Sequence, residues 1–66
     1  MNGMNLDDRI FRLQKTNLPP DLRQLLFLAD REYLQDSDEV AEAIVRMIEV
    51  ECEHRGIALF RLDALD

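Results

Sequence analysis

The stretch LRQLLFLADREYL, residues 22–34, decides the fold of this chain of 66 residues. Seven of its thirteen residues are large hydrophobes. At about 100° per residue, five apolar side chains share an arc of about 100°, as in a helix with one side in a core. These are Leu22, Leu25, Leu26, Ala29 and Tyr33. Phe27 and Leu34 lie together on another side and Leu28 on a third, so this helix carries more apolar surface than one core needs.

The segment before this stretch predicts a first helix over residues 6–16. Asn5 is a residue type that often caps helices, and the carboxylates of Asp7 and Asp8 favour the positive end of a helix dipole. Residues 9–16 also fit a strand, because polar and apolar side chains alternate along RIFRLQ.

Two consecutive prolines end this first element in either case. They push Leu18 and Pro19 into extended backbone. Pro20 can then be the first residue of a helix, where its missing N–H is no loss. We therefore predict a second helix over residues 20–34.

A third helix is predicted over residues 37–55. Asp36 with Glu39, or Ser37 alone, can cap its start, and Gly56 supplies the left-handed residue that closes it. Two adjacent apolar stripes and one polar stripe run along it, the polar one expected to be solvated. The stripes are Val40, Ile44 and Met47; Ala41, Val45, Ile48 and Cys52; and Glu42, Arg46, Glu49 and Glu53. Residues 57–66, IALFRLDALD, fit either a short fourth helix or a terminal strand.

Composition and charge favour one acidic cytoplasmic domain over residues 1–66. The formal net charge of −6 disfavours unspecific binding to nucleic acid. Cys52 is the only cysteine, so no intramolecular disulfide can form. Neither a signal peptide nor an apolar run of about 18 residues is present, which favours the cytoplasm over a membrane. The spacing of nucleophilic and basic residues supports no enzyme activity, and we expect no cofactor.

The surplus of apolar surface predicts association. A chain of this size buries a small share of its surface, and exposed apolar helix faces usually mark contacts between proteins. We therefore expect a small all-α three-helix domain, with a possible short fourth helix, that forms an obligate homodimer. It would act as an interaction or regulatory module that binds itself or another protein. The expected interface residues are Phe27, Leu28, Leu34, Met47, Ile48 and Phe60.

One spacing is compatible with a metal site. Glu51-x-x-His54 matches the Glu-x-x-His pair of di-metal sites in helical bundles, and it continues the stripe of Val40, Ile44 and Met47. Two copies could meet in a dimer, with Glu32 as a further carboxylate. A metal-binding helical dimer is thus one alternative. The other interpretation is that the stripe leaves the core at the helix end.

A further pattern runs through residues 18–48, at Leu18-Pro19, Leu22, Leu28-Ala29, Ser37, Val40 and Ala43-Ile44. In these positions the segment resembles the ribbon-helix-helix family of dimeric DNA-binding regulators and antitoxins. The resemblance implies that residues 11–17 form a strand, paired with its two-fold mate and laid in the major groove. Arg12, Gln14 and Lys15 would then face the bases. A ribbon-helix-helix dimer is therefore the alternative fold.

Overall fold

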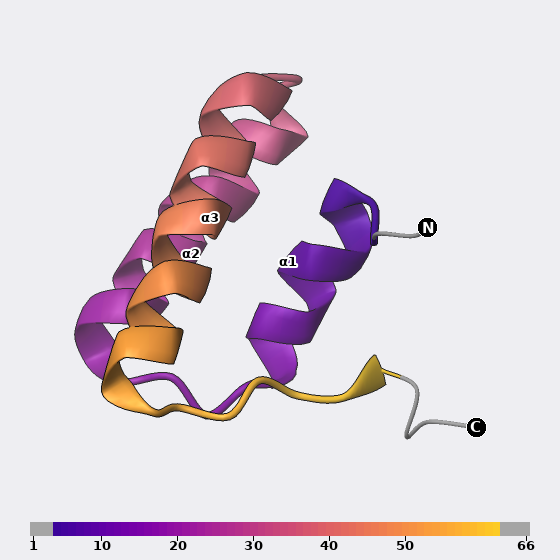
Figure 1. Ribbon diagram of the computed structural model, residues 1–66. Helices are drawn as coiled ribbons and strands as arrows, with labels where there is room; N and C mark the ends of the chain where they lie inside the picture. The colour runs from indigo at the N-terminus through magenta and orange to yellow at the C-terminus, as the bar shows by residue number, and fades with distance from the viewer. Residues whose placement is uncertain (1–3, 63–66) are drawn as a thin grey trace.

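The computed structural model describes residues 4–62 and shows three helices in chain order (Figure 1). Helix α1 spans Leu6–Lys15, α2 spans Pro20–Leu34 and α3 spans Asp38–Arg55. The described residues contain no strand. The prediction of a small all-α three-helix domain is confirmed, and residues 9–15, which also fitted a strand, are helical.

The ends of the helices follow from local chemistry, with one exception. The Oδ1 atom of Asn5 accepts a hydrogen bond from the Asp8 amide at 2.8 Å, which caps α1 as predicted. Pro20 begins α2 after the extended Pro19. Gly56 ends α3 in the left-handed region with φ of 71°, and the next amide, of Ile57, donates to the Cys52 carbonyl at 2.8 Å.

The exception is the start of α3. Ser37 precedes the helix but makes no capping hydrogen bond with its side chain, so the predicted cap is wrong there. The turn instead has Asp36 in the left-handed region with φ of 63°, and the Ser37 amide donates to the Glu32 carbonyl at 2.9 Å. Backbone hydrogen bonds to the end of α2 therefore hold this turn.

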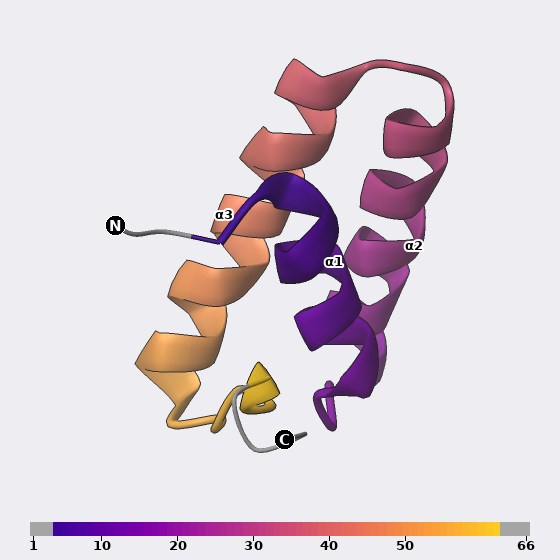
Figure 2. The same cartoon turned by 90° about the vertical axis from the view of Figure 1, so that its right-hand side faces the viewer.

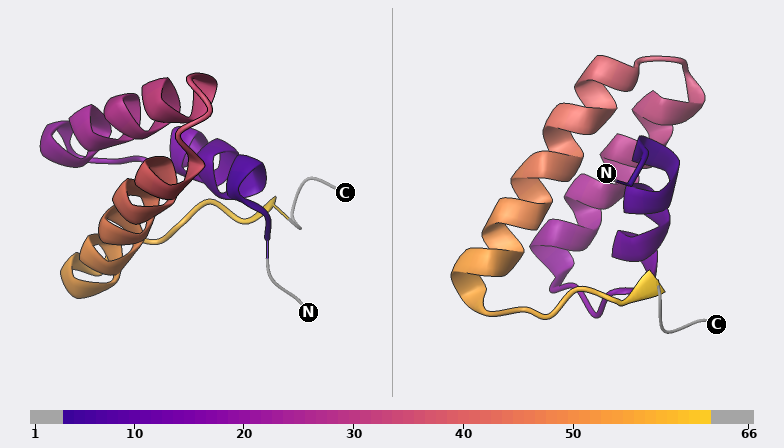
Figure 3. Two further views of the ribbon diagram at one scale, coloured as in Figure 1. Left: turned by 90° about the horizontal axis from the view of Figure 1, so that it is seen from above. Right: turned by 45° about the vertical axis from the view of Figure 1, so that its right-hand side comes forward.

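Helices α2 and α3 form an antiparallel hairpin, and α1 packs on one side of it (Figures 1 and 2). Seen from above, no other described element lies on the opposite side of the hairpin (Figure 3). Side chains from all three helices and from Leu18 build one core. Its buried members are Ile10, Leu13, Leu18, Leu22, Leu26, Ala29, Val45, Ile48 and Cys52.

The core takes only one of the two apolar stripes of α3. Ala41, Val45, Ile48 and Cys52 are fully buried. Of the other stripe, Ile44 is half-buried against the core, but Val40 is 49% and Met47 is 55% exposed, so this stripe leaves the core along most of the helix. Burial of one stripe leaves the adjacent one at the surface, on the side of α3 that α1 does not cover.

Residues 57–61 run from the end of α3 back to α1 without regular secondary structure (Figure 1), and Leu62 has a 3₁₀ conformation. Residues 63–66 of the predicted fourth element lie outside the described residues. The Phe60 amide donates to the Thr16 hydroxyl at 2.9 Å, and this hydroxyl donates to the Arg12 carbonyl at 2.8 Å. Buried Thr16 thus joins the tail to the end of α1.

No helix within residues 4–62 combines the length and the hydrophobicity that crossing a lipid bilayer requires.

Candidate functional site

The outward side of α2 is the most exposed apolar surface among the described residues. Phe27 and Leu34 are each 76% exposed, and Leu28 is 46% exposed. The core arc of α2 occupies the opposite side, so these three side chains have no place inside the domain. We call this surface the Phe27 face, and we define it by Pro20, Arg23, Gln24, Phe27, Leu28 and Leu34.

A hollow of about 290 Å³ borders Phe27 on the side of α2 that faces the end of α1. Leu26 lies in it from the core, Gln14 contributes from α1, and Arg23 and Asp30 line it from α2. A basic and an acidic side chain therefore share this hollow, one on each side of Phe27 along the helix.

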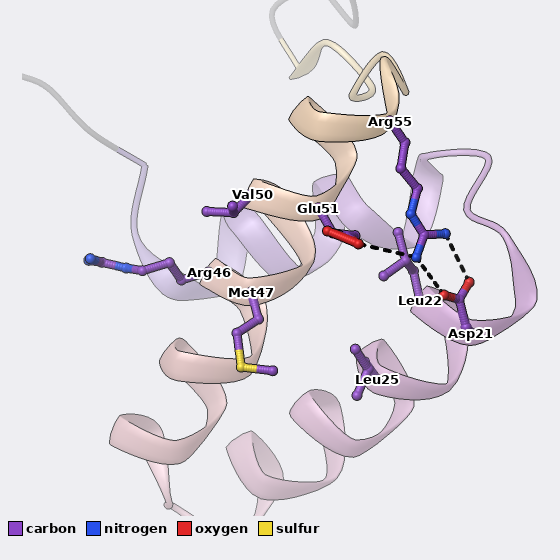
Figure 4. A pocket seen from close by; sticks show the side chains of 8 residues that line it. All are labelled: Asp21, Leu22, Leu25, Arg46, Met47, Val50, Glu51 and Arg55. Carbon is purple, nitrogen blue, oxygen red and sulfur yellow. Dashed lines mark hydrogen bonds and ion pairs between the residues drawn. The ribbon is translucent and has the colours of Figure 1, made fainter.

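The second apolar surface is a groove between α2 and α3, with a volume of about 520 Å³. Only these two helices line it, so it lies on the side of the hairpin that α1 leaves uncovered. Figure 4 shows Leu25 and Met47 pointing towards the space between the helices. We call it the α2–α3 groove. Its residues are Asp21, Leu22, Leu25, Arg46, Met47, Val50, Glu51 and Arg55.

An ion-pair cluster closes one end of this groove (Figure 4). Arg55 donates to Asp21 through Nη2 to Oδ2 at 2.7 Å and through Nη1 to Oδ1 at 3.2 Å. Its Nη2 also lies 3.3 Å from Oε2 of Glu51. The hydrogen bond from Arg55 lowers the pKa of Asp21 below its ordinary value. The cluster ties the start of α2 to the end of α3.

Two basic residues of α1, Arg9 and Arg12, form ion pairs within the fold. Arg9 and Arg12 both pair with Glu49 of α3, so this carboxylate is not part of a solvated stripe as predicted. Gln14 and Lys15 are exposed, and Lys15 Nζ lies 5.5 Å from the centroid of the Phe11 ring. The strand implied over residues 11–17 is not formed, so these side chains do not line a ribbon. The family resemblance then rests on α2 and α3 alone.

The Glu-x-x-His pair lies at the surface of α3. The closest approach is 3.9 Å, between His54 Nδ1 and Glu51 Oε1, and the His54 side chain is 73% exposed. Glu51 also pairs with Arg55, which competes for its carboxylate. Within residues 4–62, no three His, Cys, Asp or Glu side chains, Glu32 included, are placed to hold one metal ion.

The structure separates the residues predicted for an interface into four groups. Phe27 and Leu34 lie on one side of α2 with Leu28 on the flank beside Phe27, whereas Met47 lines the α2–α3 groove. Phe60 is half-buried in the tail. Ile48 is fully buried in the core, so its inclusion is wrong.

Four residues that line these surfaces are not among the predicted site residues: Val50 and Leu25 in the groove, and Arg23 and Asp30 in the hollow. The sequence signal for Val50 is a third apolar position on α3, at the edge of its polar stripe, whereas the helical periodicity places Leu25 in the core arc of α2. The signal for Arg23 and Asp30 is their spacing from Phe27, four residues before it and three after.

Comparison with family models, with curated proteins and with solved structures finds no match for this chain.

Proposed function

We propose that this chain is a small acidic protein–protein interaction module and that it forms a homodimer through the apolar side of α2. The observation that carries this proposal is the pair Phe27 and Leu34, each 76% exposed and seven residues apart on one side of the helix. Two helical turns separate them, so both can meet the same partner surface. Exposed apolar patches with a polar surround usually mark such contacts.

The energetics require more than these two side chains. Burying a phenylalanine or leucine side chain fully is worth about 1.5–3 kcal/mol. A symmetric dimer buries four such side chains, which is about 6–12 kcal/mol in total. Association costs about 4–15 kcal/mol in lost freedom of motion. The dimer therefore also needs Leu28 and complementary polar contacts around the apolar centre.

Sedimentation equilibrium of the wild type and of Phe27→Asp tests the proposal. We expect the wild type to sediment as a dimer at micromolar concentration and Phe27→Asp to sediment as a monomer. Circular dichroism of Phe27→Asp should match the wild type, because the exposed Phe27 side chain is not part of the core. Val50→Asp is the matched control, since it places the same charge in the α2–α3 groove and should remain a dimer. A monomeric wild type would overturn the proposal, as would a dimeric Phe27→Asp.

A further inference from the structure

Opposite charges flank Phe27, the centre of the Phe27 face, along α2. Arg23 precedes Phe27 by four residues and Asp30 follows it by three. At about 100° per residue, the three side chains fall within about 60° of one another on α2. The structure agrees, because all three line the same hollow. A basic, an aromatic and an acidic side chain thus follow one another along one edge of the face.

When a second α2 lies antiparallel to the first, the basic end of this sequence of side chains meets the acidic end of its copy. With a two-fold axis at Phe27, residues at equal distances before and after Phe27 come level with each other. Arg23 then lies one residue, about 1.5 Å, from the level of the partner's Asp30. Because two-fold packing brings the same edge of both helices together, these two side chains face each other. Symmetry repeats the pair on the other side of the axis.

The apolar residues follow the same register. Leu34, seven residues after Phe27, comes level with the partner's Pro20, seven residues before it. Each Phe27 lies beside the partner's hollow, whose wall includes Leu26 and the Gln14 side chain. A parallel pairing would instead put Arg23 level with the partner's Arg23, and Asp30 level with the partner's Asp30, on opposite edges of the interface. No acid would then meet a base, and like charges at one level disfavour such a complex.

The antiparallel arrangement also separates the most acidic part of each chain. The turn between α2 and α3 and the start of α3 carry Asp36, Asp38 and Glu39, all exposed. With α2 antiparallel, the two turns lie at opposite ends of an interface about 22 Å long, the length of fifteen helical residues. That is beyond the Debye length of about 8 Å at physiological ionic strength, so their repulsion is largely screened.

We propose that the occupant of the Phe27 face is a second copy of this chain. The two α2 helices pack antiparallel about a two-fold axis at Phe27, each Phe27 enters the partner's hollow, and Arg23 pairs with the partner's Asp30. This inference rests on the proposed homodimer and adds its register and its ionic contacts.

Two charge reversals test the register. Arg23→Asp leaves an acid at both position 23 and position 30, and Asp30→Arg leaves a base at both. Because position 23 faces the partner's position 30, two copies of either variant repel each other. We expect each alone to dimerise at least about tenfold more weakly than the wild type, a change of about 1.4 kcal/mol. An equimolar mixture should recover dimerisation, because every contact in the mixed dimer then joins an acid to a base. Analytical ultracentrifugation with one variant labelled by a fluorophore reads out the mixed dimer.

A second pair of reversals is the matched control. Arg46→Asp and Glu53→Arg make the same charge changes on exposed positions of α3. Each should dimerise as the wild type does, and mixing them should change nothing. If each control variant dimerised weakly alone and the mixture recovered dimerisation, the interface would lie on α3 and the inference would be overturned.

Cysteine cross-linking gives a second readout that does not depend on charge. Two copies of Leu28 lie about 3 Å apart along the helix axis in this register, whereas two copies of Leu34 lie about 21 Å apart. Leu28 is about 100° round the helix from Phe27, so its two copies lie beside each other on the same side of the helix pair rather than between the helices, where a direct disulfide could form. A short bismaleimide linker should therefore join two copies of Leu28→Cys and should not join two copies of Leu34→Cys. Cross-linking of Leu34→Cys would indicate parallel helices and would overturn the register.

The results separate this inference from the proposed function. If the wild type is a dimer that Phe27→Asp dissociates, but the charge-reversed mixture stays monomeric, the inference fails and the homodimer stands. If the wild type is a monomer, both fail.

Discussion

Arg9 of α1 donates two hydrogen bonds to the carboxylate of Glu49 of α3, from Nη2 to Oε1 at 2.8 Å and from Nε to Oε2 at 3.2 Å. Arg12, one turn later, donates to the same Oε2 at 2.9 Å. The Arg9 and Glu49 side chains are each only 18% exposed. Glu49 thus joins α1 to α3 across 40 residues of sequence, and Glu42 of α3 adds a longer contact to Arg9 at 3.5 Å.

Replacing Glu49 should loosen α1. In Glu49→Gln, two guanidinium groups lose their shared anion while remaining partly buried. Hydrogen bonds to charged groups contribute about 1.5–3 kcal/mol, and partial exposure reduces this, so we expect a loss of about 1–2 kcal/mol in the free energy of unfolding. Urea denaturation measures it. Glu53→Gln, on an exposed position of α3, should change stability by less than about 0.5 kcal/mol. Equal losses in both variants would contradict the role of Glu49.

The fold should lose stability at low pH because the Glu49 carboxylate becomes protonated. Burial alone raises the pKa of Glu49, but the hydrogen bonds and charges of Arg9 and Arg12 outweigh it, and the pKa lies below its ordinary value of 4.5. A carboxyl with a lower pKa in the folded state stabilises the fold above the unfolded value, and this contribution is lost as the pH falls through the folded value. The melting temperature of the wild type should therefore decline as the pH is lowered below about 4.5, and that of Glu49→Gln should decline less. Parallel curves for the two proteins would refute this assignment.

Thr16→Val should release the tail from the end of α1. The change keeps the shape of the side chain but removes the hydroxyl that accepts from the Phe60 amide and donates to the Arg12 carbonyl. Leaving a partly buried amide without a partner costs about 1–3 kcal/mol. Hydrogen exchange at the Phe60 amide should accelerate in Thr16→Val. Thr16→Ser keeps the hydroxyl and should keep most of the protection of that amide, and equal exchange in both variants would exclude this hydrogen bond.

The two left-handed residues should respond in opposite directions. Gly56 has φ of 71°, and a Cβ built there meets nothing within 4 Å, so Gly56→Ala adds backbone strain alone. We expect a loss of about 1 kcal/mol in the free energy of unfolding. Asp36 has a side chain at φ of 63°, so Asp36→Gly should be neutral or stabilise the fold by up to about 1 kcal/mol. Thermal denaturation compares the two, and a destabilised Asp36→Gly would show that its side chain matters more than its backbone.

The thiol of Cys52 should react only when the domain opens. Cys52 is fully buried, and burial raises its pKa above the ordinary value. Since the thiolate is the reactive form, iodoacetamide should label the folded chain more than about tenfold more slowly than the chain in urea. Rapid labelling of the folded chain would contradict the packing of α3.

Local chemistry predicts the helices well, because the residues that start and stop them act over a few positions. Asn5, Pro20 and Gly56 each perform the role that their residue type favours. Local chemistry does not show which of the two apolar stripes of α3 is buried in the core. Both are apolar, and the burial of Ile48 rather than Met47 depends on where α1 packs.

The placement of α1 depends on contacts that no local pattern contains. Glu49 belongs to a polar stripe with the helical period of a solvated face. It is largely buried only because Arg9 and Arg12 of α1 pack against it and form ion pairs with its carboxylate. The hydroxyl of Thr16 meets the Phe60 amide across 44 residues. That Phe27 and Leu34 are exposed could be predicted, since a helix turns only one side towards the core. The neighbouring hollow could not be predicted, because Gln14 lines it from α1 and the sequence does not show where α1 packs.

The short connection between α2 and α3 has a consequence for the order in which the domain forms. Only residues 35–37 separate the two helices, so closing this hairpin costs little chain entropy. The contacts of α1 with α3, by contrast, close loops of more than thirty residues. We therefore expect the folding nucleus to be the α2–α3 hairpin, with α1 joining after the rate-limiting step. Substitutions at Glu49 should then change the unfolding rate far more than the folding rate.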